Sequence, residues 1–79
     1  MKFNLIDLPH INVNDTTATI TKINFKNGDK VRENQEIMEV ESTKTSVSIE
    51  SKNNGYIYYT RSVNDEIATG EVIAIISEI

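Results

Sequence analysis

Apolar and polar residues alternate in short runs along most of this chain, which is the pattern of half-buried β-strands. Threonine, valine and isoleucine are abundant, and no stretch of a dozen residues shows helical apolar spacing without β-branched crowding. Turn-forming residues separate the runs at Asn27–Asp29, Asn53–Gly55 and Val63–Asp65. A change of apolar phase between Ile20 and Ile23 predicts a bulge. We therefore expect an all-β fold without helices. The expected strands are Leu5–Leu8, Ala18–Phe25, Glu36–Glu41, Ser46–Ser51, Tyr56–Thr60 and Val72–Ser77.

The second half of the chain echoes the first half at a shift of 36 residues, for example from Asp29 to Asp65. Each half has a turn, a hydrophobic anchor, a second turn and a strand. One such unit cannot cover its own apolar face, whereas two units stacked face to face can. The echo therefore predicts two similar four-stranded units. The other matched pairs are Val31 with Ile67, Asn34 with Gly70, Ile37 with Ile73 and Val40 with Ile76.

Length, charge and composition narrow the class of protein. The chain has 79 residues, no cysteine, one histidine and a formal net charge of −4. Without disulfides or a metal site, so short a chain depends on regular packing for its stability. The acidic balance argues against nucleic-acid binding, and no apolar run approaches a membrane span or a signal peptide. We expect a single domain over residues 1–79 that is monomeric in isolation, cytoplasmic, and without nucleic-acid or membrane partners.

A β-hairpin between positions 36 and 51 contains the candidate site. If Thr43 and Lys44 are the two central residues of a tight turn, Val40 lies opposite Val47 and Met38 opposite Ile49. Both apolar pairs then share one face of the hairpin. A turn moved by one residue would place Val40 opposite a serine and destroy that agreement. The sequence therefore predicts that Lys44 lies at the hairpin tip.

A lysine at such a tip is exposed, and four small hydroxyl residues around it leave a modifying enzyme room to approach. These are Ser42, Thr43, Thr45 and Ser46. An exposed lysine is mostly protonated at neutral pH, so its acylation needs an external ligase. We find no nucleophile–base pair or metal-ligand set and expect no catalytic residue, no metal and no enzymatic activity in the isolated chain. Taken alone, a tip lysine is more often a solvated charge or a guard against strand-edge aggregation.

The ordered series of motifs around this hairpin gives the lysine a wider context. Gly28–Val31 and Val40–Lys44 lie upstream, and Val47–Ser51, Gly55 and Val63–Ile73 lie downstream. From about residue 11 to the C-terminus the chain resembles the biotinyl/lipoyl attachment family, most closely the lipoyl domains of 2-oxo-acid dehydrogenase acyltransferases. The resemblance implies a lipoyl-like flattened barrel, or barrelled sandwich hybrid, of two four-stranded antiparallel sheets with quasi-twofold symmetry.

The resemblance also implies where the parts of the domain lie. The modified lysine and the chain ends are expected at opposite extremities of the barrel. The polar stretch 12–17 is expected near the tip hairpin, as a plain connection. Independently of the resemblance, Tyr56, Tyr58 and Tyr59 are expected to pack on a sheet rather than to form a ligand site.

The residues beside Lys44 bear on the cofactor that the resemblance implies. Biotin-accepting domains typically flank the lysine with methionines, whereas Thr43 and Thr45 stand here. Lipoyl domains favour Glu-(Ser/Thr)-Asp-Lys-Ala, of which Glu41 and Ser42 are present and the acid and the alanine are absent. Lipoate attached covalently to Lys44 is therefore the expected cofactor, with biotin the less favoured choice.

The expected function is a carrier domain on which Lys44 bears a swinging arm for acyl transfer between partner active sites. The expected partners are a lipoate or biotin protein ligase and the enzymes of an acyl-transfer complex. Two alternatives stay open. One is an unmodified lipoyl-like structural or docking module, because the acid and the alanine beside the lysine are missing, and the other is a biotin carboxyl carrier domain.

Overall fold

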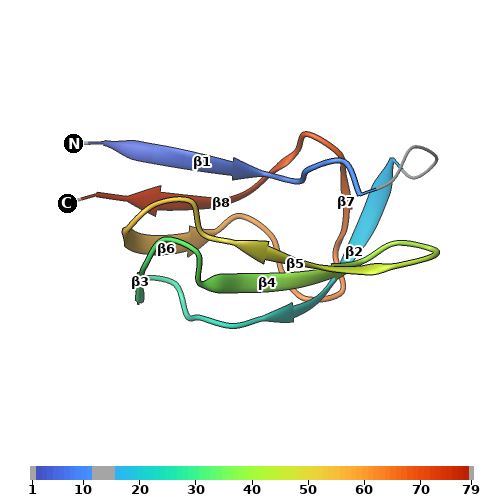
Figure 1. Cartoon of the computed structure of the whole chain (residues 1–79), viewed down its shortest axis with the longest axis horizontal. Helices are drawn as coiled ribbons and strands as arrows, with labels where there is room; N and C mark the ends of the chain where they lie inside the picture. Colours follow the sequence, from blue (N-terminus) through green and yellow to red (C-terminus); the bar gives the residue numbers. More distant parts are fainter. Residues whose placement is uncertain (1, 12–15, 79) are drawn as a thin grey trace.

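The computed structural model describes residues 2–11 and 16–78, which form eight β-strands and no helix (Figure 1). The described part accordingly contains no helix capable of crossing a membrane. The strands are β1 (Phe3–Asp7), β2 (Thr17–Ile23), β3 (Lys30–Val31), β4 (Glu36–Glu41), β5 (Ser46–Glu50), β6 (Gly55–Tyr59), β7 (Glu66–Ala68) and β8 (Val72–Ser77). The predicted all-β class is confirmed.

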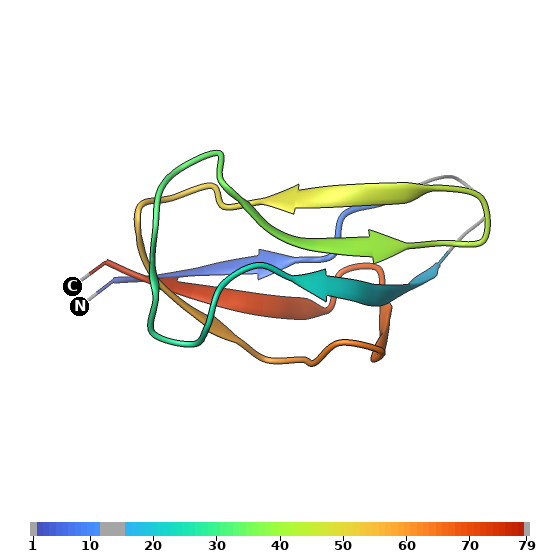
Figure 2. The ribbon, with the colours of Figure 1, turned by 90° about the horizontal axis from the view of Figure 1, so that it is seen from below.

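The strands form two four-stranded antiparallel sheets, in the orders β1-β8-β6-β3 and β5-β4-β2-β7. Advancing every strand of the first sheet by four, counted cyclically, gives the second sheet. The two halves of the chain are therefore related by a quasi-twofold operation, and each sheet takes strands from both halves. The repeat predicted two similar four-stranded units, and two four-stranded sheets are present, but each sheet combines strands of both halves instead of one half each (Figure 2).

The repeat extends to the backbone of the turns. Gly28 and Asn64 have φ of 91° and 77°, and Asn34 and Gly70 have φ of 73° and 88°. Both pairs are separated by 36 residues, and in each pair one half uses glycine where the other uses asparagine. Only glycine and asparagine adopt this left-handed conformation readily. The turn positions are therefore equivalent in geometry although their residues differ.

An aspartate side chain closes the same turn in each half. The backbone N–H of Lys26 donates to Oδ2 of Asp29 at 2.8 Å, and the N–H of Ser62 donates to Oδ2 of Asp65 at 2.9 Å. These contacts assign the two aspartates to turn formation.

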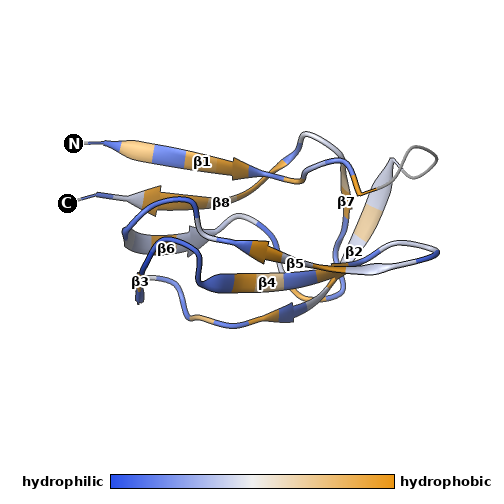
Figure 3. Cartoon of the chain, in the orientation of Figure 1, coloured by the Kyte–Doolittle hydropathy of each residue, from blue (hydrophilic) through white to orange (hydrophobic). Residues whose placement is uncertain are grey.

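The core lies between the two sheets and is built mainly from isoleucine and valine. Hydrophobic positions are spread along the strands of both sheets (Figure 3). Val31 and Ile67, the anchors of the repeat, are fully buried. They lie in β3 and β7, two short strands that the sequence pattern did not predict as strands. The fully or nearly fully buried apolar residues are Ile6, Leu8, Ala18, Ile20, Val31, Ile37, Met38, Val40, Ile49, Ile57, Ile67, Ile73, Ala74 and Ile76.

The other predicted strands differ from the structure only at their ends. The first strand begins at Phe3 and ends at Asp7, before Pro9, and β2 ends at Ile23. The predicted bulge is present, because the register between β2 and β4 shifts between Ile20 and Lys22. Of the predicted polar connection 12–17, residues 12–15 lie outside the described residues.

The molecule is elongated, with extents of 37 × 19 × 18 Å. Both ends of the described chain lie at one extremity, where the N–H of Glu78 donates to the carbonyl of Lys2 at 3.0 Å. The connection between β4 and β5 projects at the other extremity (Figures 1 and 2). The hairpin tip and the chain ends are therefore as far apart as the fold allows.

Candidate functional site

The β4–β5 hairpin has the register that the apolar pairs predicted. Val40 lies opposite Val47, and Met38 lies opposite Ile49. The N–H of Ser42 donates to the carbonyl of Thr45 at 2.9 Å, which closes the strands around two central residues. Those central residues are Thr43 and Lys44. The structure thus places the chain reversal where the sequence predicted it.

The hairpin is anchored over most of its length. β4 is an interior strand, paired with β5 on one side and with β2 on the other. Met38 and Val40 are fully buried beneath it, and Ile49 is 5% exposed. Burying side chains of this size stabilises the hairpin by roughly 1.5–3 kcal/mol each. The base of the hairpin is therefore held by the core while its tip extends into solvent.

The tip itself is built from small hydroxyl residues around one amine. Lys44 is exposed, as are Thr43, Thr45 and Ser46. Ser42 is buried, and its Oγ donates to the carbonyl of Thr45 at 3.3 Å, so one hydroxyl reinforces the turn. The lysine stem has solvent around it, and no bulky neighbour along the chain restricts an approaching enzyme. The arrangement is suited to covalent modification of an amine.

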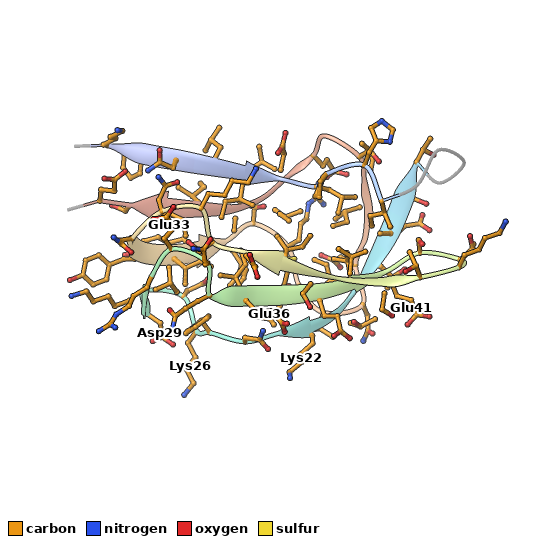
Figure 4. All side chains as sticks on the ribbon, viewed as in Figure 1. Lys22, Lys26, Asp29, Glu33, Glu36 and Glu41 are labelled. Carbon is orange, nitrogen blue, oxygen red and sulfur yellow. The ribbon has the colours of Figure 1, made fainter. Side chains whose placement is uncertain are left out.

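Carboxylates are common on the outer face of the hairpin sheet, where Glu36 and Glu41 of β4 lie beside Lys22 of β2 (Figure 4). Glu39 and Glu41 alternate with the buried residues of β4, and serines lie opposite them on β5. The Ser48 hydroxyl, followed by the Asn24 amide at 2.8 Å, lowers the pKa of Glu36 at the start of the strand. Glu36 therefore stays ionised at neutral pH. Lys44 lies exposed at the hairpin tip, beyond these carboxylates.

A shallow hollow of about 360 Å³ lies on the flank of the hairpin, between its tip and strands β2 and β7. Hydroxyl groups and two carboxylates line it, and sequence reasoning missed it because its walls come from three separate segments. The lining residues include Thr17, Thr19, Ser42, Thr43, Glu41 and Glu66. Within the described ranges, no group of three or more potential metal ligands exists.

The three tyrosines of β6 do not share one environment. Tyr59 is half-buried against the core, and its hydroxyl donates to the carbonyl of Ile37 at 2.7 Å, linking the two sheets. Tyr56 and Tyr58 are exposed on the outer face of the other sheet. The prediction of sheet packing is therefore confirmed for Tyr59, whereas Tyr56 and Tyr58 belong to the molecular surface.

The family model for biotin/lipoyl attachment, described as "Biotin-requiring enzyme", matches residues 4–76. The scaffold is all-β and presents Lys44 on a hairpin at the extremity opposite the chain ends. This is the arrangement of a carrier domain. The chain belongs to the biotin/lipoyl attachment family. Domains of this family carry a group for other active sites rather than catalyse the chemistry themselves. No curated protein sequence matches the chain.

Two solved structures show the same fold. One is urea carboxylase from Kluyveromyces lactis, with a TM-score of 0.80 and 19% identity over 98% of this chain. The chain corresponds to only 6% of that protein. The other is the lipoyl domain of the 2-oxoglutarate dehydrogenase complex from Azotobacter vinelandii, with a TM-score of 0.78 and 20% identity. That match covers 94% of this chain and 95% of the lipoyl domain.

Proposed function

We propose that the chain is a lipoyl carrier domain in which Lys44 bears the lipoyl group in amide linkage. The observation that carries this proposal is the exposure of Lys44 at the tip of a core-anchored hairpin, at the extremity opposite the termini. Membership of the biotin/lipoyl family supplies the class of cofactor. The residues beside the lysine, Thr43 and Thr45 rather than methionines, favour lipoate over biotin.

Attachment is the work of a ligase. Its activated lipoyl carbonyl is attacked by the Lys44 amine, the amide bond forms, and the activating group leaves while the ligase accepts the ammonium proton. This chain contributes an amine on a flexible stem, a stiff two-stranded base and small hydroxyl neighbours. When bound, a lipoyl group supplies a dithiolane that accepts acyl groups and electrons.

The geometry also fits a moving arm. The lysine stem and the attached group extend from one extremity, and the chain ends lie at the other, so a partner enzyme at the tip does not meet the connection to the rest of an assembly. Tethering holds the reactive group at high local concentration near successive active sites. We infer acyl-transfer enzymes as the partners.

Biotin is the second candidate cofactor, because the family model is described by biotin-requiring enzymes and one structural match is urea carboxylase. The same exposed amine fits either acid. The two cofactors are distinguished by the ligase that recognises the hairpin, so the experiment compares both ligases on the same chain.

The test is intact-mass measurement of the chain co-expressed with a lipoate ligase and, separately, with a biotin ligase. We expect one lipoyl group per chain in the first case and little or no biotin in the second. Lys44→Arg keeps the charge and should abolish the modification while leaving the circular dichroism spectrum unchanged. A lipoylated Lys44→Arg chain would refute the site, and biotinylation alone would replace lipoate with biotin. If neither ligase modifies the chain, the remaining explanation is an unmodified lipoyl-like structural or docking module.

A further inference from the structure

Two asparagine–glycine pairs in the turns have a chemistry that the proposed carrier function does not use. They are Asn27–Gly28, just before β3, and Asn54–Gly55, at the start of β6. Asparagine is a chemically labile residue. Because glycine has no Cβ, its backbone nitrogen can approach the preceding side chain closely. An asparagine that precedes glycine is therefore especially prone to lose its side-chain amide.

The reaction is an intramolecular substitution followed by hydrolysis. The backbone nitrogen of glycine attacks Cγ of the asparagine, a C–N bond forms, and the side-chain amide leaves as ammonia with the proton that the nitrogen gave up. Water then opens the cyclic imide at either of its carbonyls, which gives aspartate or isoaspartate. The reaction requires a glycine N–H that is free and an asparagine side chain that can turn toward it.

The fold withholds both requirements at Asn27–Gly28. Oδ1 of Asn27 accepts a hydrogen bond from the N–H of Tyr59 at 2.8 Å, which directs the side chain to β6. The N–H of Gly28 donates to the carbonyl of Ile57 at 2.7 Å. The attacked group and the attacking group are thus bound to two residues of the same strand. Neither can react until this segment leaves β6.

Asn54–Gly55 is held in the reciprocal way, by residues in β3 and just after it. Oδ1 of Asn54 accepts a hydrogen bond from the N–H of Glu33 at 2.8 Å. Gly55 lies opposite Val31 in the ladder between β3 and β6. The pairing that holds the first asparagine therefore also holds the second. A single event, the separation of β3 from β6, releases both.

β3 can open without the rest of the domain. It has two residues and lies at the edge of its sheet, next to β6. Local opening of such a segment has a lower free energy than global unfolding. Val31 opposes the opening, because its side chain is fully buried in the core. The burial of this valine therefore controls how often both asparagines become reactive.

We propose that Asn27 and Asn54 are latent deamidation sites, which the pairing of β3 with β6 keeps intact and which local opening of β3 releases together. The reacting groups belong to this chain, and the co-reactant is water. β3 lies in the half of the molecule that holds the chain ends, away from the hairpin tip (Figure 1). The proposal is therefore independent of the group that Lys44 bears.

The two products differ in their effect on the fold. Aspartate keeps a side-chain oxygen, so the N–H groups of Tyr59 and Glu33 retain an acceptor. Isoaspartate instead routes the backbone through Cγ and lengthens it by a methylene. At position 54 this change comes directly before Gly55, where even an added Cβ would lie 2.8 Å from Cγ2 of Ile76. Isoaspartate at this position should prevent β3 from pairing again, so a transient opening becomes permanent.

The test follows amide loss at each asparagine of the whole chain by tandem mass spectrometry. The chain is incubated at mildly alkaline pH, with and without a denaturing concentration of urea. We expect deamidation of Asn27 and Asn54 to be on the order of a hundredfold slower in the folded chain, as local opening of an anchored edge allows. The ratio of the folded to the unfolded rate should agree between the two sites, because one opening exposes both.

Two variants separate the opening of β3 from unfolding of the domain. Val31→Ala removes buried methyl groups from the anchor and should speed deamidation at both sites about tenfold. Ile67→Val is the matched control, because Ile67 is the buried anchor of β7, an edge strand of the other sheet. This control should change either rate by less than about twofold, as expected for a residue outside the opened segment.

Equal rates with and without urea would overturn the proposal, since neither asparagine would then be protected. Equal acceleration by Val31→Ala and Ile67→Val would also overturn it, because the route would then be unfolding of the whole domain. Amide hydrogen exchange along β3 in the unsubstituted chain measures the opening without any variant. Its protection should match that of both asparagines, and a difference of about tenfold or more would refute a shared opening.

Discussion

Single residues hold the two sheets together at defined points, and Tyr59 is the clearest of them. Its ring packs against the core, and its hydroxyl reaches from one sheet to the carbonyl of Ile37 in the other. Burial raises the pKa of the Tyr59 phenol above its ordinary value of 10.0. The neutral form is therefore the form that the fold favours.

Replacing this hydroxyl tests its role. Tyr59→Phe should lower the free energy of unfolding by about 1 kcal/mol, because the Ile37 carbonyl loses its donor while the ring remains. Chemical denaturation at neutral pH measures the change. An unchanged midpoint would contradict the assigned contact.

The same residue predicts an alkaline limit to stability. Because the pKa of Tyr59 is higher in the folded chain than in the unfolded chain, its contribution is complete below pH 10 and is lost as the pH rises above that value. Tyr59→Phe should be less stable at neutral pH but should lose less stability above pH 10. Parallel losses in both proteins would show that the phenol is not the responsible group.

Sequence reasoning at the residue scale placed Lys44 correctly at the hairpin tip and was incomplete for the tyrosines. The position of Lys44 followed from two apolar pairs that only one register satisfies. In β6 the residues alternate, with Tyr56 and Tyr58 outward and Ile57 and Tyr59 inward, but tyrosine occurs on both faces, so residue type alone did not separate them. The core contact of Tyr59 and the exposure of Tyr58 show that the first points inward and the second outward.

At the scale of elements, the long strands were predictable and the short ones were not. β4 and β8 have the length and apolar content that define a strand by pattern alone. β3 and β7 have two and three residues, too few to show a period, so their anchors Val31 and Ile67 were visible only as isolated apolar positions. The surface hollow beside the hairpin was not predicted for a related reason. Its walls come from separate segments that meet only in the folded chain.

The approach of β6 to β8 depends on a glycine. A Cβ on Gly55 would lie 2.8 Å from Cγ2 of Ile76 and would also strike the carbonyl oxygen of Ser77. Gly55→Ala should therefore destabilise the fold by about 2–3 kcal/mol, as expected when a tightly packed contact is overfilled.

Gly28→Ala is the matched control for this prediction. Gly28 has φ of +91°, and a Cβ added there would meet no atom within 4 Å. The substitution therefore costs backbone strain of about 1–2 kcal/mol and no clash. Thermal or urea unfolding of both variants measures the difference. A Gly55→Ala protein as stable as the Gly28→Ala protein would disprove the close approach.

At the scale of the whole molecule, the repeat explains how so short a chain has a core without disulfides. The matched turns, with glycine and asparagine exchanged between halves, orient equivalent strands into opposite sheets. The weak sequence echo preserved the turns and the anchors, so it predicted two similar four-stranded units, but it did not predict that each sheet takes strands from both halves. The contrast between carboxylates on one outer face and exposed tyrosines on the other was not predictable, since outward residues carry no periodic signal of their own.

The same symmetry fixes the functional geometry. The connection after β4 is the hairpin that presents Lys44, while the equivalent point after β8 is the end of the described chain. One operation therefore places the candidate attachment site and the terminus at opposite extremities. The proposed carrier function uses that separation, because the tip must reach other active sites.

Site-resolved tandem mass spectrometry of the ligase-modified chain tests whether Lys44 is the attachment site. The six lysines, at positions 2, 22, 26, 30, 44 and 52, are distinguishable by the peptides that contain them. Modification confined to Lys44 is the predicted result, because only this amine stands at the tip of the anchored hairpin. Modification of Lys22 or Lys26 instead, or an even distribution over several lysines, would contradict the assignment.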